Sequence, residues 1–295
     1  MEINWLEVVI YAVVQGGYYS LMALGLTLVY GIGRIVNLAH GSLIMFGVYA
    51  YYVFSTILKI DPFLAIVMAM LLTGIIGAIT HRSSIHPVLG DDVAIMVVTL
   101  TIGVLLSEVL IMFFTSKTVS IINPLKPFGH IRFLGVLLSW TQVISFFLSV
   151  ALFFLVTLFI NVSKIGKALQ AMAQDREAAM LMGINVNALY VLVMIMAAML
   201  AAIGGIMVSL PGASVVPNLW INSIVSTFAI VILGGLGSIK GSLLGSLIVA
   251  FSEQIVYYTL PQGGGMILIA PLAVMVAVLL VRPKGLFGKR VEMED

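Results

Sequence analysis

Two carboxylic acids stand inside stretches of sequence that are otherwise apolar. Glu108 lies within residues 93–115 and Glu253 within residues 241–259. An acid inside a membrane span is costly to bury and is therefore a functional candidate, for example as the proton site of an ion-coupled carrier. Glu253 could instead pair with a basic residue of a second subunit, or both acids could lie near a membrane interface that satisfies them. The polar residues with which Glu108 would line a groove are Thr99, Thr101 and Ser107.

A second polar group, Asn37, His40 and Ser42, stands at the start of the apolar stretch 41–58. Polar side chains buried without partners are costly, so these residues either line a transport pathway or gate, or they find local partners. In the local alternative, Asn37 and Ser42 cap helices and His40 packs against its neighbours. His40 is not expected to bind a metal, because the other histidines lie in other loops and show no ligand spacing.

Motifs for covalent chemistry or nucleotide binding are absent from the sequence. It contains no Gly-x4-Gly-Lys-Ser/Thr phosphate loop, no nucleophile elbow and no cysteine. We therefore expect a protein that is not an enzyme, with no cofactor, no resident metal and no nucleic-acid partner. Any ATP hydrolysis that drives it must come from another polypeptide.

The composition requires lipid as the solvent for most of the chain. Of the 295 residues, 62% are hydrophobic and 9% are charged, and the mean hydropathy is +1.20. A soluble domain carries about 25% charged residues, so this chain cannot cover a water-facing surface of that kind. We expect an all-α polytopic membrane helix bundle that occupies residues 1–295 as a single domain.

Nine stretches are candidates for membrane segments, because a spanning helix needs about 20 largely apolar residues. One of them, 221–236, is short and ends in a glycine-rich run, so it is either a span or a re-entrant segment shielded by surrounding protein. The sequence therefore predicts eight or nine membrane segments. The nine stretches are 8–30, 41–58, 62–80, 93–115, 140–160, 189–210, 221–236, 241–259 and 265–281.

The positions of the basic residues predict the orientation of the bundle. If the C-terminus is cytoplasmic and all nine stretches cross, ten Lys and Arg residues lie inside and four lie outside, in keeping with the positive-inside rule. We therefore expect the N-terminus outside and the C-terminus in the cytoplasm. The inside set is Arg34, Arg82, Lys164, Lys167, Arg176, Lys240, Arg282, Lys284, Lys289 and Arg290, and the outside set is Lys59, Lys117, Lys126 and Arg132.

The most polar loop, 161–188, is cytoplasmic in this orientation. Strong helix formers dominate it, and the acids Asp175 and Glu177 suit the N-terminus of a short helix. Gly183 stands where a residue with left-handed backbone would end that helix. An apolar face on such a helix suits insertion into a groove of a partner, or else packing on the bundle at the membrane interface. This face consists of Ala178, Leu181 and Met182.

Three glycines form the ladder Gly237-x-x-x-Gly241-x-x-x-Gly245. This spacing lets helix backbones approach closely. We interpret the ladder as a helix-packing surface whose facing helix belongs either to this chain or to a partner.

Several motifs resemble one family of membrane proteins. Glu177-Ala178-Ala179-x-x-x-Gly183 is similar to the EAA loop of ABC importer permeases, which is the coupling helix that docks on the ATP-hydrolysing subunit. Three further segments resemble branched-chain amino acid permeases of the LivH/LivM type, and their order and spacing are closer to LivH. They are Gly33-Arg-Ile-Val-Asn-Leu-Ala-His-Gly41, Val231-Ile-Leu-Gly-Gly-Leu-Gly-Ser-Ile-Lys-Gly241 and Val281-Arg-Pro-Lys-Gly-Leu-Phe-Gly288.

The resemblance implies a heteromeric importer in a bacterial or archaeal cytoplasmic membrane. A second, LivM-like permease subunit would form the other half of the pore, two cytoplasmic ATPase subunits would drive alternating access, and an extracytoplasmic substrate-binding protein would deliver a branched-chain amino acid. The implied coupling residues are Arg176, Glu177, Ala178, Ala179 and Gly183. An ABC permease for urea or short amides and a self-sufficient ion-coupled secondary transporter remain alternatives.

Overall fold

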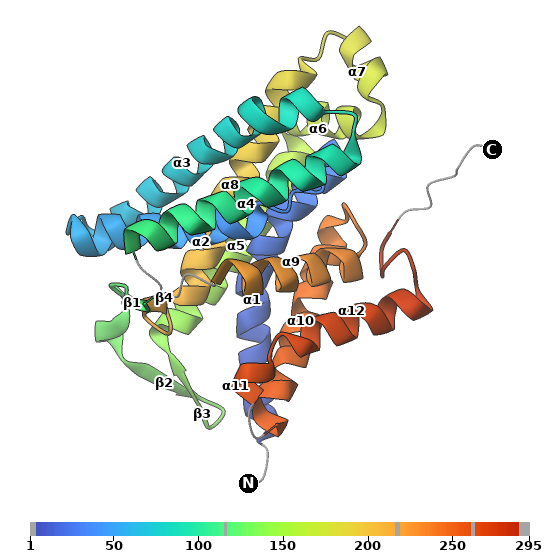
Figure 1. The fold of residues 1–295 in the computed structure, drawn as a ribbon. Coiled ribbons are helices and arrows are strands. Elements are labelled where there is room, and N and C mark those ends of the chain that lie inside the picture. The colour runs from blue at the N-terminus through green and yellow to red at the C-terminus, as the bar shows by residue number, and fades with distance from the viewer. Residues whose placement is uncertain (1–3, 115–116, 216–218, 261–262, 289–295) are drawn as a thin grey trace.

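The computed structural model describes residues 4–114, 117–215, 219–260 and 263–288, and most of these residues are helical (Figure 1). Within these ranges, six helical segments are long and apolar enough to cross a membrane. They are α1 (Trp5–Gly33), α3 with its continuation (Pro62–Val88), α4 (Asp92–Phe114), α5 (Trp140–Val162), α8 (Val186–Ser209) and α10 (Ile239–Thr259).

Three apolar helices are shorter, which is why the count of spanning helices is six rather than the expected eight or nine. They are α2 (His40–Tyr52), α9 (Leu219–Gly234) and α12 (Ile269–Val281). The one-turn helix α11 (Gly263–Met266) precedes α12. All nine predicted apolar stretches are nevertheless helical over most of their described length. Lys289 and Arg290, which entered the prediction of orientation, lie outside the described residues.

Helix α1 forms the centre of the bundle and contacts α5, α8, α9 and α10. Small residues along α1 permit these close approaches. A Cβ atom added at Gly25 would lie 2.8 Å from the carbonyl oxygen of Ala197 in α8, and one added at Gly16 would lie 2.7 Å from the side chain of Leu247 in α10. The core around α1 is therefore packed backbone to backbone, as is common between membrane helices.

Two helices of the bundle end in π-helical turns. The helix α2 continues into the π-helix η1 (Val53–Ile57), and α3 (Pro62–Thr80) continues into η2 (His81–Ile85) and the 3-10 turn η3 (His86–Val88). Proline starts α3 after the N-cap Asp61, whose side chain accepts hydrogen bonds from the backbone of Phe63 and Leu64. π-helical turns are rare and are found often at functional sites.

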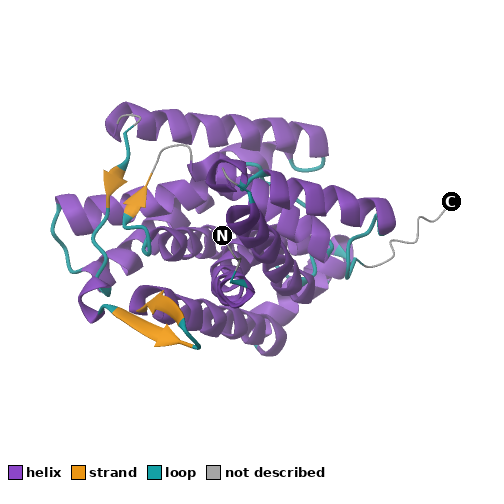
Figure 2. Ribbon diagram, turned by 90° about the horizontal axis from the view of Figure 1, so that it is seen from below, coloured by secondary structure: helices purple, strands orange, loops and turns teal. Residues whose placement is uncertain are grey.

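Short antiparallel strands gather at the end of the molecule that lies away from α7 (Figures 1 and 2). Strand β1 (Val119–Ser120) pairs with β4 (Ser214–Val215), and β2 (His130–Phe133) forms a hairpin with β3 (Val136–Ser139). The hairpin turns through Leu134 and Gly135, both with positive φ, which matches the twist of the strands. The dipeptides Asn123-Pro124 and Lys126-Pro127 predict turns in residues 116–139, but they do not predict these pairings. The 3-10 turn η4 (Lys126–Phe128) lies between β1 and β2 in the sequence.

The loop 161–188 folds into two helices at the opposite end, α6 (Lys164–Gln174) and α7 (Arg176–Leu181). In Figure 1 α7 projects beyond the ends of the neighbouring helices. Ser163 caps α6 by accepting a hydrogen bond from the backbone of Gly166 at 2.8 Å. The predicted helical loop therefore exists, but a break at Asp175 divides it into two pieces.

Candidate functional site

Helix α7 has well-formed caps at both ends. The side chain of Asp175 accepts hydrogen bonds from the backbone N–H groups of Glu177 and Ala178, at 2.9 and 3.0 Å. Gly183 has a φ of 79° and ends the helix. Its N–H donates to the carbonyl of Met180 at 3.0 Å, and the N–H of Ile184 donates to the carbonyl of Ala179 at 3.1 Å. This pair of bonds is the Schellman motif, which requires a left-handed residue at the position of Gly183.

The last turn of α7 presents apolar side chains to the outside of the molecule. Leu181 is 88% exposed and Met182 is 82% exposed, whereas Ala179 is 4% exposed and anchors the helix. The apolar face predicted from the sequence includes Leu181 and Met182 correctly, and Met180 (47% exposed) belongs to it as well. Arg176, Glu177 and Ala178 are also exposed. Contiguous exposed apolar side chains on a projecting tip suit burial against a partner protein or a membrane surface.

Helix α2 begins deep inside the bundle. The ring nitrogen Nε2 of His40 lies 2.9 Å from the carbonyl oxygen of Met22, and the hydroxyl of Ser42 donates to the carbonyl of Gly103 at 2.7 Å. Met22 lies 11 residues before the end of α1 and Gly103 lies 11 residues after the start of α4. At 1.5 Å per residue, the first turn of α2 is therefore about 16 Å from that end of the bundle.

The polar group at the start of α2 is partly satisfied by its own chain. The side-chain oxygen of Asn37 accepts a hydrogen bond from the backbone of Ala39, and the hydroxyl oxygen of Thr99 accepts one from the backbone of Leu38. The amide nitrogen of Asn37 and Nδ1 of His40 are buried and have no hydrogen-bond partner within the described residues. The structure thus brings Asn37, His40, Ser42 and Thr99 together at mid-depth.

The other candidates on α4 do not join this group. Thr101 and Glu108 are exposed on the outer face of the helix, whereas Thr99 and Ser107 are buried. The hydroxyl of Thr101 donates to the carbonyl of Val97 in the preceding turn at 2.8 Å, so its polarity is satisfied within α4. Glu108 therefore does not line a common groove with Thr99 and Ser107.

Glu253 lies at the centre of a hydrogen-bond network that joins three helices. One carboxyl oxygen accepts hydrogen bonds from Gln15 at 2.6 Å and Tyr19 at 2.7 Å, both on α1, and the other accepts one from Ser226 of α9 at 2.8 Å. Gln254 extends the network by donating to the side-chain oxygen of Gln15. The side chain of Glu253 is 1% exposed, so a partner subunit does not reach it in this conformation. Its own chain supplies its hydrogen-bond donors.

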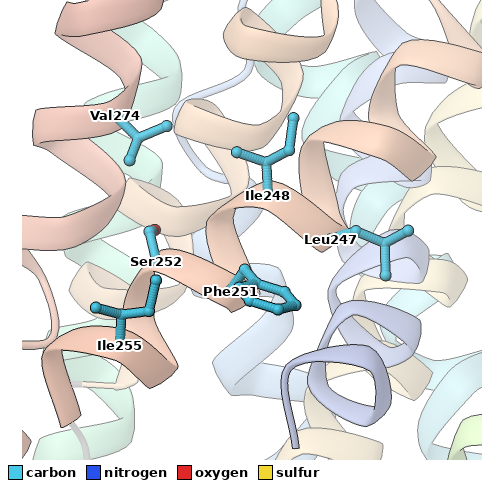
Figure 3. Close-up of a pocket in the computed structure, with 6 residues that line it drawn as sticks. All are labelled: Leu247, Ile248, Phe251, Ser252, Ile255 and Val274. Atoms are coloured by element: carbon cyan, nitrogen blue, oxygen red, sulfur yellow. The ribbon is translucent and has the colours of Figure 1, made fainter. Parts of the chain in front are cut away.

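A shallow cavity of about 360 Å³ lies between α10 and α12 (Figure 3). Its lining is almost wholly apolar, and the hydroxyl of Ser252 is turned back to donate to the carbonyl of Val249. The cavity offers no partner for the charged groups of a polar solute, so we do not assign it to a transport pathway. The lining residues are Leu247, Ile248, Phe251, Ser252, Ile255 and Val274.

The glycine ladder packs within this chain. A Cβ atom at Gly245 would lie 2.5 Å from the carbonyl oxygen of Ile230, and Gly241 meets the backbone of Gly234, so both residues of α10 face α9. Gly237 differs from them because it lies in the turn before α10, with a φ of 80°, and faces Gly31 of α1. The facing helix that the sequence left open is α9 for two positions and α1 for the third.

Three segments that are far apart in the sequence meet at one end of the bundle: the last turn of α1, the turn between α9 and α10, and the C-terminal segment after α12. Gly31 contacts Gly237, and the C-terminal segment pairs with the end of α9 through hydrogen bonds from the backbone of Leu286 to Leu233 at 2.8 Å and from Phe287 to Gly234 at 3.0 Å. The contacts are backbone to backbone, which explains why glycine occupies positions 31, 234 and 237.

The sequence model of the family described as "Branched-chain amino acid transport system / permease component" matches residues 8–281. The chain belongs to this family. The permease is similar to the high-affinity branched-chain amino acid transport system permease protein BraD of Pseudomonas aeruginosa, with 28% identity over 97% of this chain and 96% of the relative. It is similar to LivH of Escherichia coli, with 27% identity over 94% of this chain and 93% of the relative.

A relative from an archaeon and one solved structure complete the comparison. The probable branched-chain amino acid transport permease protein LivH of Methanocaldococcus jannaschii is 28% identical over 94% of this permease and 90% of the relative. PsaBC from Streptococcus pneumoniae, solved in complex with Fab, has a TM-score of 0.52 and 19% identity, and covers 94% of this chain and 92% of that chain. This structural likeness shows the fold of the permease, and the family is one of transport components.

Sequence reasoning identified Glu253 but missed the residues that surround it. Gln15, Tyr19 and Ser226 are scattered over two other helices. Only the spacing of four residues between Gln15 and Tyr19 hints that these two share a face of α1. Tyr190 and His81 were missed as well. Both are buried polar rings near the ends of membrane helices, and a search for such rings would have found them.

Proposed function

We propose that this chain is one of two permease subunits of an ATP-driven importer of branched-chain amino acids in a bacterial or archaeal cytoplasmic membrane. The observation that carries the proposal is the exposed apolar tip of α7, Leu181 and Met182, on a helix held by caps at both ends. A carrier that works alone has no need of such a projecting docking element. The named activity of the similar permeases supplies the class of solute.

In this proposal the tip of α7 inserts into a groove on a separate ATPase subunit, which hydrolyses ATP. Leu181 and Met182 supply the apolar contact, while Arg176 and Glu177 supply charges at its rim. The fixed Schellman turn at Gly183 lets α7 transmit force instead of bending. Two ATPase subunits would serve the two permease subunits. The remaining coupling residues are Ala178 and Ala179.

The solute would pass between this chain and a second, LivM-like permease subunit, after delivery by an extracytoplasmic binding protein. With α2 and η1 counted together, and with α9 and α12, as membrane segments beside the six long helices, the bundle has nine segments, the larger of the two expected numbers. We propose that the N-terminus faces outside and that α6 and α7 face the cytoplasm, since this puts Lys164, Lys167 and Arg176 inside.

We further propose that the start of α2 contributes to gating. A helix that begins at mid-depth aims the positive end of its dipole into the bundle, an arrangement used by transporters at their binding sites. Asn37, His40, Ser42 and Thr99 are the pathway or gate candidates that this placement supports. Thr101, Glu108 and Glu253 do not join this group in the structure. They remain pathway candidates only for a conformation in which the helices rearrange and bring them to the pathway.

The docking part of the proposal is tested by purifying the tagged protein from its native membrane in mild detergent and identifying the chains that come with it. Wild-type protein should retain ATPase subunits and a second permease. Leu181→Glu should lose the ATPase subunits and keep the second permease. Leu134→Glu, at a 67% exposed position on the β2–β3 hairpin, is the matched control and should keep both. Retention of the ATPase subunits by Leu181→Glu would argue against docking through α7.

A further inference from the structure

The ring of Tyr190 is the meeting point of three elements at the α7 end of the bundle. Tyr190 lies in the first turns of α8 and is 6% exposed. The guanidinium of Arg176, the first residue of α7, lies 5.4 Å from the centre of its ring. The ring of His81, at the end of α3, stacks on it at 5.6 Å with an angle of 22° between the planes. A Cβ atom at Gly33, the last residue of α1, would lie 3.0 Å from the ring edge.

His81 contributes its shape and its ring face to this cluster. It is fully buried, and neither of its ring nitrogens has a hydrogen-bond partner in the described part of the chain. A buried polar ring without hydrogen bonds costs free energy, so its contacts with Tyr190 and with the ring of His86, 6.2 Å away, must offset that cost. His81 is also the first residue of the π-helix η2, a type of turn found often at functional sites.

Helix α7 is attached to α8 at both of its ends. At its start, Arg176 lies over Tyr190. At its end, the Schellman turn at Gly183 joins it directly to Asn185, the N-cap of α8, which accepts a hydrogen bond from the backbone of Ala188 at 3.1 Å. Ala179 of α7 is 4% exposed, and α7 contacts α8. The connection from α7 to α8 is therefore short, since only residues 182–185 lie between the two helices.

We propose that Tyr190 is a positioning residue through which movement of α7 reaches α3, by way of His81, and α1, by way of Gly33. The inference rests on the proposed function, since it assumes that ATPase subunits act on α7. The aromatic face is the group that matters, because it contacts both the guanidinium of Arg176 and the ring of His81. Packed rings of this kind transmit displacement, since close-packed interiors do not deform continuously.

The test compares uptake of solute with hydrolysis of ATP in the complete transporter, purified from its native membrane and reconstituted in liposomes. Tyr190→Leu removes the ring, and we expect solute moved per ATP hydrolysed to fall roughly 10-fold, within the range of couplings between distant sites. Tyr190→Phe keeps the ring and should restore the wild-type ratio. Arg176→Met changes an exposed side chain and removes the guanidinium from the ring of Tyr190, and should lower the same ratio.

Tyr51→Leu is the control for loss of a buried ring as such. Tyr51 is fully buried at the other end of the bundle, where its hydroxyl donates to the carbonyl of Ile122. The Tyr51→Leu variant should have a lower thermal stability than wild-type protein but should move the same amount of solute per ATP hydrolysed. Equal ratios in Tyr190→Leu, Arg176→Met and wild-type protein, with ATPase subunits still bound, would overturn the role of Tyr190 and leave the proposed function intact. Purification of wild-type protein without ATPase subunits would overturn the proposed function and the inference with it.

Discussion

Removal of the Glu253 carboxyl group is predicted to destabilise the bundle strongly, because Glu253 holds α1, α9 and α10 together. Three side chains donate hydrogen bonds to it: Gln15, Tyr19 and Ser226. In Glu253→Ala these three donors lose their acceptor inside a buried network. A buried donor without a partner costs more than the hydrogen bond contributed.

The size of the effect follows from the number of bonds. Hydrogen bonds between membrane helices contribute about 0.6 kcal/mol on average and up to about 1.7 kcal/mol, so loss of three such bonds predicts about 2–5 kcal/mol. Ser226→Ala removes one donor and leaves the other two, and should cost about 1 kcal/mol. Because the two residues share one bond, the costs of Glu253→Ala and Ser226→Ala should be less than additive in the double variant.

The assay is unfolding by SDS in mixed detergent micelles, which gives the free energy of unfolding for each variant. Glu108→Ala is the matched control, since Glu108 is also a carboxylic acid within a membrane helix but is exposed on the outer face of α4. It should not lower the free energy of unfolding, because an exposed acid on a membrane helix is itself costly to place in lipid. Equal effects of Glu253→Ala and Glu108→Ala would refute the structural role assigned to the network.

Three further predictions concern packing, coupling and orientation. Gly41→Ala should lower the free energy of unfolding by about 1–3 kcal/mol, because its Cβ would lie 2.6 Å from the backbone of α9, whereas Gly265→Ala, with no atom within 4 Å, should be neutral in the same SDS titration. Gly183→Val should reduce solute moved per ATP, since a β-branched residue disfavours a φ of 79°. Gly129→Val, at another position of positive φ (72°) but away from α7, should not. A reporter fused to the C-terminus should be active in the cytoplasm. A signal from the external side would contradict the proposed orientation, and with it the cytoplasmic placement of α7.

The helices were predictable from the sequence because apolar length and composition determine them. The stretch 62–80 is α3 to the residue, and the loop helix ends at Gly183 because only a left-handed residue fits there. The depth at which α2 begins was not predictable, since residues 34–39 carry no signal that the chain returns about 16 Å into the bundle. The break in the polar loop at Asp175 has a local cause. The side chain of Asp175 accepts hydrogen bonds from the backbone at the start of α7, so a new helix begins there.

The candidate site was predictable only in part, because neighbours in space are not marked in the sequence. Glu108 and Glu253 look alike as acids in apolar stretches, yet one is exposed and the other is surrounded by donors from two other helices. The ladder from Gly237 to Gly245 reads as one helical face, but Gly237 lies in a turn and faces a different helix. In both cases the tertiary arrangement, which local pattern does not encode, decides the role.

The central claim is that this permease moves its solute only as part of an ATP-driven complex. The measurement that tests it most directly is uptake of radiolabelled leucine into liposomes that contain the complete purified transporter. We expect leucine to accumulate only when ATP is present on the side of the membrane that α7 faces and the binding protein is present on the opposite side. Liposomes that contain this chain alone should take up no leucine. Leucine uptake by this chain alone, driven by an ion gradient and abolished in Glu253→Gln, would contradict the account.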